Sequence, residues 1–99
     1  MPYKIQFRKR ATKEYLDAIS WYRQRSQKSA DNFVLIVDQT LDLIEKQPYR
    51  FRIIYKNFHQ VKTKKYPFNI VYFIEEESQF IIITSLFHDK RNPATKFKS

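Results

Sequence analysis

The stretch "FNIVYFIEEESQFIIITSLF" (Phe68–Phe87) decides the fold, because it contains the most apolar runs of the chain. "FNIVYFI" (Phe68–Ile74) and "FIIITSLF" (Phe80–Phe87) are nearly continuous apolar segments rich in β-branched and aromatic residues. Such segments are typical of strands buried at the centre of a sheet. "EEESQ" (Glu75–Gln79) joins them as a hairpin loop, although it lacks the usual glycine.

Alternation of apolar and polar residues predicts further strands on either side of this pair. One lies at "YKIQF" (Tyr3–Phe7), and another at "HQVKTKKY" (His59–Tyr66), which places Lys62 and Lys64 on the same face. "FRIIYK" (Phe51–Lys56) fits either a short strand or an extended loop.

Two amphipathic helices are predicted between the first strand and Pro48. The first lies within "ATKEYLDAISWYRQRSQ" (Ala11–Gln27); Ser29 can cap the second, and Pro48 ends it. Their apolar stripes follow helical spacing and consist of Ala11, Tyr15, Ala18, Ile19 and Tyr22 in the first helix and of Phe33, Ile36, Val37, Leu41 and Ile44 in the second. The predicted fold is therefore α+β: an N-terminal strand, an αα-hairpin, and a mostly antiparallel sheet of about four strands with the helices on one face.

Length and composition predict one domain that spans residues 1–99. The apolar fraction of 42% and the aromatic fraction of 17% are too high for a disordered chain of this size. Cysteine and glycine are both absent, which excludes disulfides, cysteine zinc sites and glycine-rich phosphate loops. No apolar run is long enough to span a membrane, so we expect a soluble cytoplasmic protein with no membrane partner. We also expect no cofactor.

The balance of charge points to an acidic or polyanionic partner. Nineteen Lys and Arg residues against ten Asp and Glu leave a formal charge of +9. Helices that cover one face of a sheet leave the other partly open, and basic side chains can converge there to hold phosphates while aromatic rings stack on bases. The candidates are Arg8–Arg10, Lys62, Lys64, Lys65, Lys90 and Arg91, with Tyr66, Tyr72 and His88 nearby. Alternatively, these are solvated lysines that prevent aggregation of the sheet edge.

The segment "FHDKRNP" (Phe87–Pro93) follows the last apolar run and contains His88. Histidine exchanges protons near neutral pH, so His88 can act as general acid or base in RNA cleavage while an adjacent cation stabilises the phosphate. The simpler interpretation is a polar turn in which Asp89 makes an Asx turn and Pro93 closes it. His59 is interpreted as a surface or structural residue, and two histidines so far apart predict no metal site.

The ordered set of these elements resembles the RelE/ParE toxin superfamily of bacterial type II toxin–antitoxin systems, which includes plasmid-stabilisation proteins. The resemblance rests on "YLDAISWY", "LDLIEKQP" and especially "KKYPFNIVYFIEEESQFIIITSLFHDKRNP". It implies a small basic toxin that is neutralised by a cognate acidic antitoxin. Members of the RelE-like branch cleave mRNA in the ribosome as mRNA interferases, whereas members of the ParE-like branch inhibit DNA gyrase without a hydrolytic site.

The resemblance also implies roles for particular residues. Lys62 matches a basic residue on a sheet strand of the nucleases, His88 matches an acid/base histidine, and Lys90 or Arg91 matches the basic residue after the last strand. Lys64, Lys65, Arg8, Arg10 and Tyr66 join this set as candidate substrate-binding residues.

Two departures from the nuclease pattern are visible. Asn69 stands where the nucleases usually have an arginine, and Phe97 is the aromatic residue nearest to the position of their C-terminal tyrosine. Ribosome-dependent mRNA cleavage, non-catalytic inhibition of gyrase, and an inactive or plain RNA-binding member therefore all remain open at this point.

Overall fold

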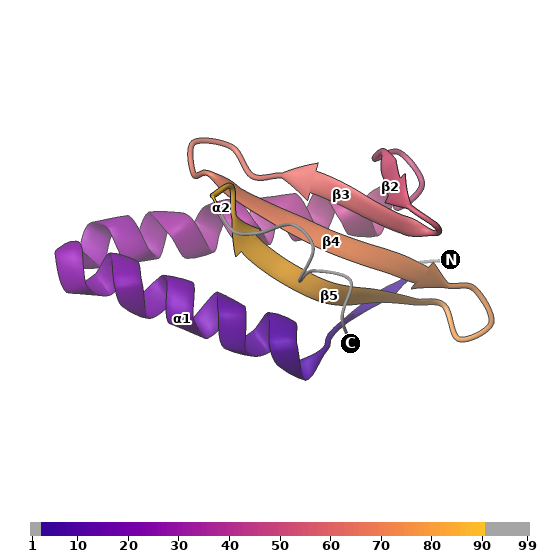
Figure 1. Cartoon of the computed structure of the whole chain (residues 1–99), viewed down its shortest axis with the longest axis horizontal. Coiled ribbons are helices and arrows are strands. Elements are labelled where there is room, and N and C mark those ends of the chain that lie inside the picture. The colour runs from indigo at the N-terminus through magenta and orange to yellow at the C-terminus, as the bar shows by residue number, and fades with distance from the viewer. Residues whose placement is uncertain (1–2, 91–99) are drawn as a thin grey trace.

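The two apolar runs form the central antiparallel strands of a five-stranded sheet, and two helices cover one of its faces (Figure 1). The computed structural model describes residues 3–90. Their elements are β1 (Lys4–Phe7), α1 (Lys9–Arg25), α2 (Gln27–Lys46), β2 (Ile53–Tyr55), β3 (Phe58–Lys62), β4 (Phe68–Glu75) and β5 (Phe80–His88). The predicted α+β class is confirmed.

The strands lie in the order β1-β5-β4-β3-β2. The pairs β2–β3, β3–β4 and β4–β5 are antiparallel, whereas β1 runs parallel to β5 with Lys4 opposite Phe80. The segment that fits either a strand or a loop contains the short strand β2, which adds a fifth strand to the predicted sheet of about four. Both helices lie between β1 and β2 in the chain. In the sheet, β1 occupies one edge and pairs with β5, the last strand described.

The helices follow the predicted apolar stripes, but the second begins earlier than predicted. Ser26, not Ser29, is its N-cap: Ser26 has an extended backbone, and its hydroxyl accepts a hydrogen bond from the amide of Ser29 over 3.2 Å. One residue therefore separates α1 from α2. Within residues 3–90, neither helix combines the length and the apolar character that crossing a membrane requires.

The core between helices and sheet is built largely from aromatic rings. Tyr22, Phe33, Tyr66 and Phe68 pack with ring centroids 5.0 to 6.2 Å apart. Tyr72, which was expected beside the basic face, lies instead in this core with its hydroxyl donating to the carbonyl of Pro48 over 2.6 Å. The expectation was wrong because Tyr72 faces the helices, and burial raises the pKa of its phenol.

Turns without glycine shape the ends of the strands. Lys56, Lys65 and Gln79 adopt left-handed conformations with φ of 49°, 69° and 61°, which residues with a Cβ adopt at some cost. The predicted strand His59–Tyr66 is shorter in the structure, since β3 ends at Lys62 and the chain turns through Lys65. Thr63 stabilises this turn by donating from its hydroxyl to the carbonyl of Tyr66 over 2.8 Å.

Candidate functional site

A closed polar network occupies the face of the sheet that the helices leave open. The amide Nε2 of Gln60 donates to Oδ1 of Asn69 over 3.0 Å, and Nδ2 of Asn69 donates to Oδ1 of Asp89 over 2.6 Å. The second carboxylate oxygen of Asp89 is 2.8 Å from Nζ of Lys62. Strands β3 and β4 and the residue that follows β5 therefore contribute to one cluster, which we call the open-face network (Gln60, Lys62, Asn69 and Asp89).

Strand register explains why these residues meet. Lys62 lies opposite Asn69, and Gln60 lies two pairs further along the same two strands. Side chains of alternate residues share a face of a sheet, so all three side chains project from the open side. Asp89 follows β5, and its amide donates to the carbonyl of Pro67, which holds it beside Asn69.

The open-face network holds the Asp89 carboxyl in its charged form. Hydrogen bonds from Lys62 and then from Asn69 lower the pKa of Asp89 below its ordinary value, while partial desolvation opposes this shift. Within the described residues, the Asp89 carboxylate contacts side chains from β3 and β4. The predicted Asx turn would involve the amide of residue 91, which lies outside the described residues.

A row of aromatic rings continues along the same face. The rings of Tyr55 and Phe58 stack with centroids 6.4 Å apart, and Phe58 meets Phe73 edge-on at 5.7 Å. Cations border both ends, with Nζ of Lys56 5.4 Å from the Tyr55 ring and the guanidinium of Arg8 5.6 Å from the Phe73 ring. The open face therefore combines apolar rings with positive charge.

His88 lies on the opposite side of the sheet from this network. Its ring contacts Phe68 edge-on at 5.3 Å, and Phe68 packs against the helices. A groove of about 320 Å³ between α1 and the end of β5 contains His88, Glu14, Asp17 and Trp21 in its walls. The Lys90 amide donates to Nδ1 of His88 over 3.1 Å, which places the ring proton of a neutral imidazole on Nε2.

Glu14 fastens the first helix to the last strand at this groove. Its Oε1 accepts from the amide of Leu86 over 2.9 Å and from the hydroxyl of Ser85 over 3.1 Å. Its Oε2 lies 3.4 Å from Nε of Arg10. β1 pairs with β5 only as far as Ile83. The Glu14 carboxylate therefore accepts the hydrogen bond from the Leu86 amide that a neighbouring strand would otherwise accept.

The residues predicted to be catalytic do not form one constellation. His88 faces the groove beside α1, and Lys62 belongs to the open-face network on the other side of the sheet. Arg91 lies outside the described residues.

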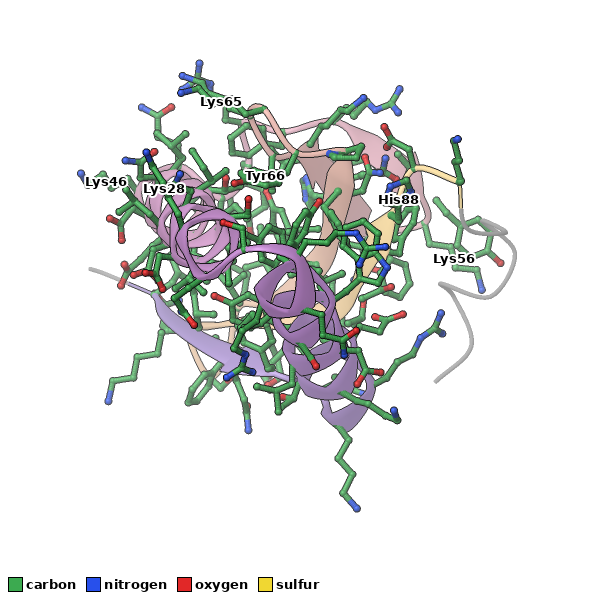
Figure 2. The ribbon with its side chains drawn as sticks, turned by 90° about the vertical axis from the view of Figure 1, so that its left-hand side faces the viewer. Lys28, Lys46, Lys56, Lys65, Tyr66 and His88 are labelled. Carbon is green, nitrogen blue, oxygen red and sulfur yellow. The ribbon has the colours of Figure 1, made fainter. Side chains whose placement is uncertain are left out.

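The predicted substrate-binding residues are also dispersed. Lys64 and Lys65 follow β3 in the turn that leads to β4, where both border α2. Figure 2 shows Lys65 at the rim of the molecule, Tyr66 turned inward, and His88 in a separate region. Tyr66 packs on core rings and donates to the carbonyl of Ser29 over 3.1 Å, so it does not present its ring to the open face.

The three remaining basic residues have three different environments. Arg8 lies over Phe73 on the open face, as expected. Arg10 pairs with Glu14 at the start of α1, and Lys90 is exposed next to His88. The expected convergence on the open face therefore holds for Arg8 and Lys62 but not for the whole set.

His59 is a structural residue, consistent with the second of the two roles considered for it. It is buried, its Nδ1 lies 2.7 Å from the carbonyl oxygen of Phe51, and its ring stacks on Tyr72 with centroids 5.0 Å apart.

Sequence reasoning did not identify Gln60, Asp89 and Glu14 as contributors, and it treated Asn69 only as a missing arginine. Alternation in "HQVK" and "FNIV" was the available signal, because it places Gln60, Lys62 and Asn69 on one face. The contact of Asp89 with them depends on the register of β4 and β5, for which a single sequence carries no direct signal.

Comparisons with known proteins agree with this architecture. A family profile described as the ParE toxin of the type II toxin–antitoxin system parDE matches residues 5–93. No curated protein matches the chain.

Three solved structures illustrate the likeness of fold. The isolated E. coli RelE toxin is 16% identical, with 94% of this chain and 90% of that one aligned and a TM-score of 0.63. RelE in the intact E. coli RelBE toxin–antitoxin complex is also 16% identical, with coverages of 90% and 99% and a TM-score of 0.64. The RelBE2 complex of Mycobacterium tuberculosis gives 13% identity, coverages of 89% and 99%, and a TM-score of 0.61. Identities this low establish the fold alone.

Proposed function

We propose that this chain, which belongs to the ParE toxin family of type II toxin–antitoxin systems, arrests growth by binding its target without hydrolysing it. DNA gyrase is the first candidate target, since inhibition of gyrase characterises the ParE-like branch that the chain resembles. Residues 1–99 act as one toxin domain in this proposal, and a cognate antitoxin keeps it inactive.

The observation that carries the proposal is the separation of His88 from Lys62. General acid–base cleavage of a phosphodiester needs the proton-transfer group and the charge-stabilising cation around the same phosphate. Here the two side chains face opposite sides of the sheet. This arrangement suits a binding surface better than a hydrolytic site.

Growth arrest by a His88→Asn variant tests the proposal. Asparagine retains a hydrogen-bond acceptor near the Lys90 amide but cannot transfer protons, so we expect growth arrest equal to that of the unchanged chain. Purified gyrase with supercoiled DNA should accumulate cleaved DNA when the toxin is added, while a purified translation system should continue. Lys28→Ala, on the exposed surface of α2, serves as the control for expression. Loss of arrest by the histidine variant with an unchanged melting temperature would contradict non-catalytic action.

Ribosome-dependent mRNA cleavage is the second candidate, favoured by the state of His88. Its Nδ1 accepts from the Lys90 amide, and the ring lines a groove with Trp21 and Tyr22, against which a base can stack. In this alternative the His88→Asn variant loses arrest, and translation stops in the purified system without gyrase-dependent DNA cleavage.

We further propose that the antitoxin binds along α2. Two grooves of about 530 and 380 Å³ share Ile36 and Gln39 and run between this helix and the turn after β3. Their described walls combine apolar side chains with four cations and no carboxylate; the cations are Arg50, Lys62, Lys64 and Lys65. An acidic amphipathic segment complements such a surface. Solved complexes of RelE-fold toxins with RelB antitoxins support the existence of such a partner.

Charge reversal tests this docking surface. The double variant Lys64→Glu/Lys65→Glu should weaken antitoxin binding at least tenfold, mainly by slowing association. Replacing Lys9 and Lys13 of α1 by Glu gives the same change in net charge elsewhere and should have a smaller effect. Equal losses in the two double variants, measured by surface plasmon resonance, would place the antitoxin elsewhere.

A further inference from the structure

We propose that Gln60, Lys62 and Asn69 form an oxyanion-binding site whose internal occupant is the Asp89 carboxylate, and that a phosphate group of a single-stranded nucleic acid binds there by displacing Asp89. Asp89 would thus act as an autoinhibitory group that restrains the affinity of a strongly basic protein for polyanions. The inference stands independently of the toxin's target.

The first argument is the arrangement of the donors. Nδ2 of Asn69 and Nζ of Lys62 contact different oxygens of the carboxylate, at 2.6 Å and 2.8 Å. Two donors that point at two oxygens of one anion match a phosphate as well as a carboxylate. The contact therefore has the form of a ligand site.

The second argument is that the neutral donor is preorganised. Asn69 is only 5% exposed, and Gln60 donates to its Oδ1, so its Nδ2 must point toward Asp89. A donor that is fixed before the anion arrives loses little entropy when the anion binds. The pairing of Lys62 with Asn69 across β3 and β4 fixes the spacing of the two donors.

The third argument is that the occupant is held loosely. The side chains of Lys62 and Asp89 are 61% and 35% exposed, and exposed ion pairs contribute little to stability. Asp89 is anchored through its amide to the Pro67 carbonyl, so its carboxylate can rotate away while the backbone stays in place. A phosphate, which carries more charge and remains ionised, competes effectively for such a site.

The fourth argument identifies the ligand as a nucleic acid strand. Phe58 lies four residues before Lys62 on the same strand and face, which corresponds to about 13 Å. Phe58 contacts Phe73, and Arg8 lies over the latter ring. A strand whose phosphate binds at Lys62 can therefore place a base further along the strand on this aromatic row, the arrangement used by sheets that bind single strands.

The test compares two carboxylates by the same substitution. Asp89→Asn removes the internal anion, and Asp17→Asn removes an exposed carboxylate of α1 that pairs with Lys13 over 2.9 Å. Both variants gain one unit of positive charge. Fluorescence anisotropy with a labelled oligothymidylate should show about threefold to fivefold tighter binding for Asp89→Asn, because the competitor is an exposed ion pair. Asp17→Asn should change the affinity less than twofold.

Lys62→Met in the Asp89→Asn background identifies the site itself. This double variant should lose the gain and lower the salt dependence by about one counterion. Equal effects of Asp89→Asn and Asp17→Asn, or a gain that survives Lys62→Met, would overturn the proposal.

Inorganic phosphate separates a site for any oxyanion from one selective for nucleic acid. In the Asp89→Asn variant it should shift the NMR signals of the Asn69 side-chain amide at lower concentrations than in the unchanged protein. Phe58→Leu should weaken binding of the oligothymidylate and leave binding of inorganic phosphate unchanged. If it leaves both unaffected, the assignment to a nucleic acid strand fails.

Discussion

The two faces of the sheet use similar residue types for different purposes. On the helix side, Phe33, Phe68 and Tyr72 are buried, and the Tyr72 hydroxyl has its own acceptor. On the open side, Phe58 and Phe73 remain partly exposed, and the nearby polar groups form ion pairs and hydrogen bonds at the surface. Although Val71, Ile82 and Phe87 on the open side are buried as well, the half-exposed rings there contribute less to stability than the buried rings on the helix side, and the ion pair there can change partner.

The largest expected difference in stability between the two faces comes from replacing one ring on each side of the sheet. Phe33→Ala removes a fully buried side chain that contacts four other rings, and should lower the free energy of unfolding by about 3–5 kcal/mol. Phe73→Ala, on the open face, should cost only about 1–2 kcal/mol because its side chain is already partly hydrated. Urea denaturation measures both, and equal losses would contradict the assignment of stability to the helix side.

The next effect concerns the attachment of α1 to β5. Glu14→Ala deprives the Leu86 amide and the Ser85 hydroxyl of their acceptor and should cost about 2–3 kcal/mol. Glu14→Gln keeps one carbonyl oxygen and should recover about half of that loss. Amide hydrogen exchange should show faster exchange at Leu86 in the alanine variant, and unchanged exchange there would exclude this role of the carboxylate.

A smaller effect is expected from a single buried hydroxyl. Tyr72→Phe leaves the ring in place but removes the donor to the Pro48 carbonyl, which should cost about 1–2 kcal/mol. Tyr49→Phe provides the exposed counterpart and should change the stability by less than about 0.5 kcal/mol. Thermal unfolding distinguishes the two, and identical melting temperatures would show that the buried hydroxyl contributes nothing.

The smallest effect is the pH dependence of the open-face network. The pKa of Asp89 is lower in the folded chain than in the unfolded chain, so its contribution is present above the unfolded pKa, near 4, and is lost as the pH falls through the folded pKa. The stability difference between the unchanged protein and Asp89→Asn should therefore be greatest near neutral pH and shrink below about pH 4. Urea midpoints measured across this range test the sign, and a difference that does not vary with pH would refute it.

Sequence reasoning reached the fold more completely than the site. Helical stripes such as Phe33 and Val37 and the apolar strands were readable because periodic burial leaves a local signal. Ser26 and Ser29 are both serines that can cap a helix, and they lie only three residues apart. Residue type alone therefore did not show which of them caps α2. The site depends on residues distant in the chain: Asp89 meets Asn69 through strand register, and Glu14 meets Leu86 through helix docking. Neither contact follows from local periodicity.

The parallel pairing of β1 with β5 has a consequence for the time at which the protein becomes functional. Lys4 leaves the ribosome early, but its partner Phe80 belongs to the last strand described. Closing so long a loop makes the native topology slow to form, and no shorter nascent chain can complete it. We therefore expect the sheet, its open face and the groove beside α1 to arise together only after β5 has emerged. An incomplete translation product should accordingly be harmless to the cell that makes it.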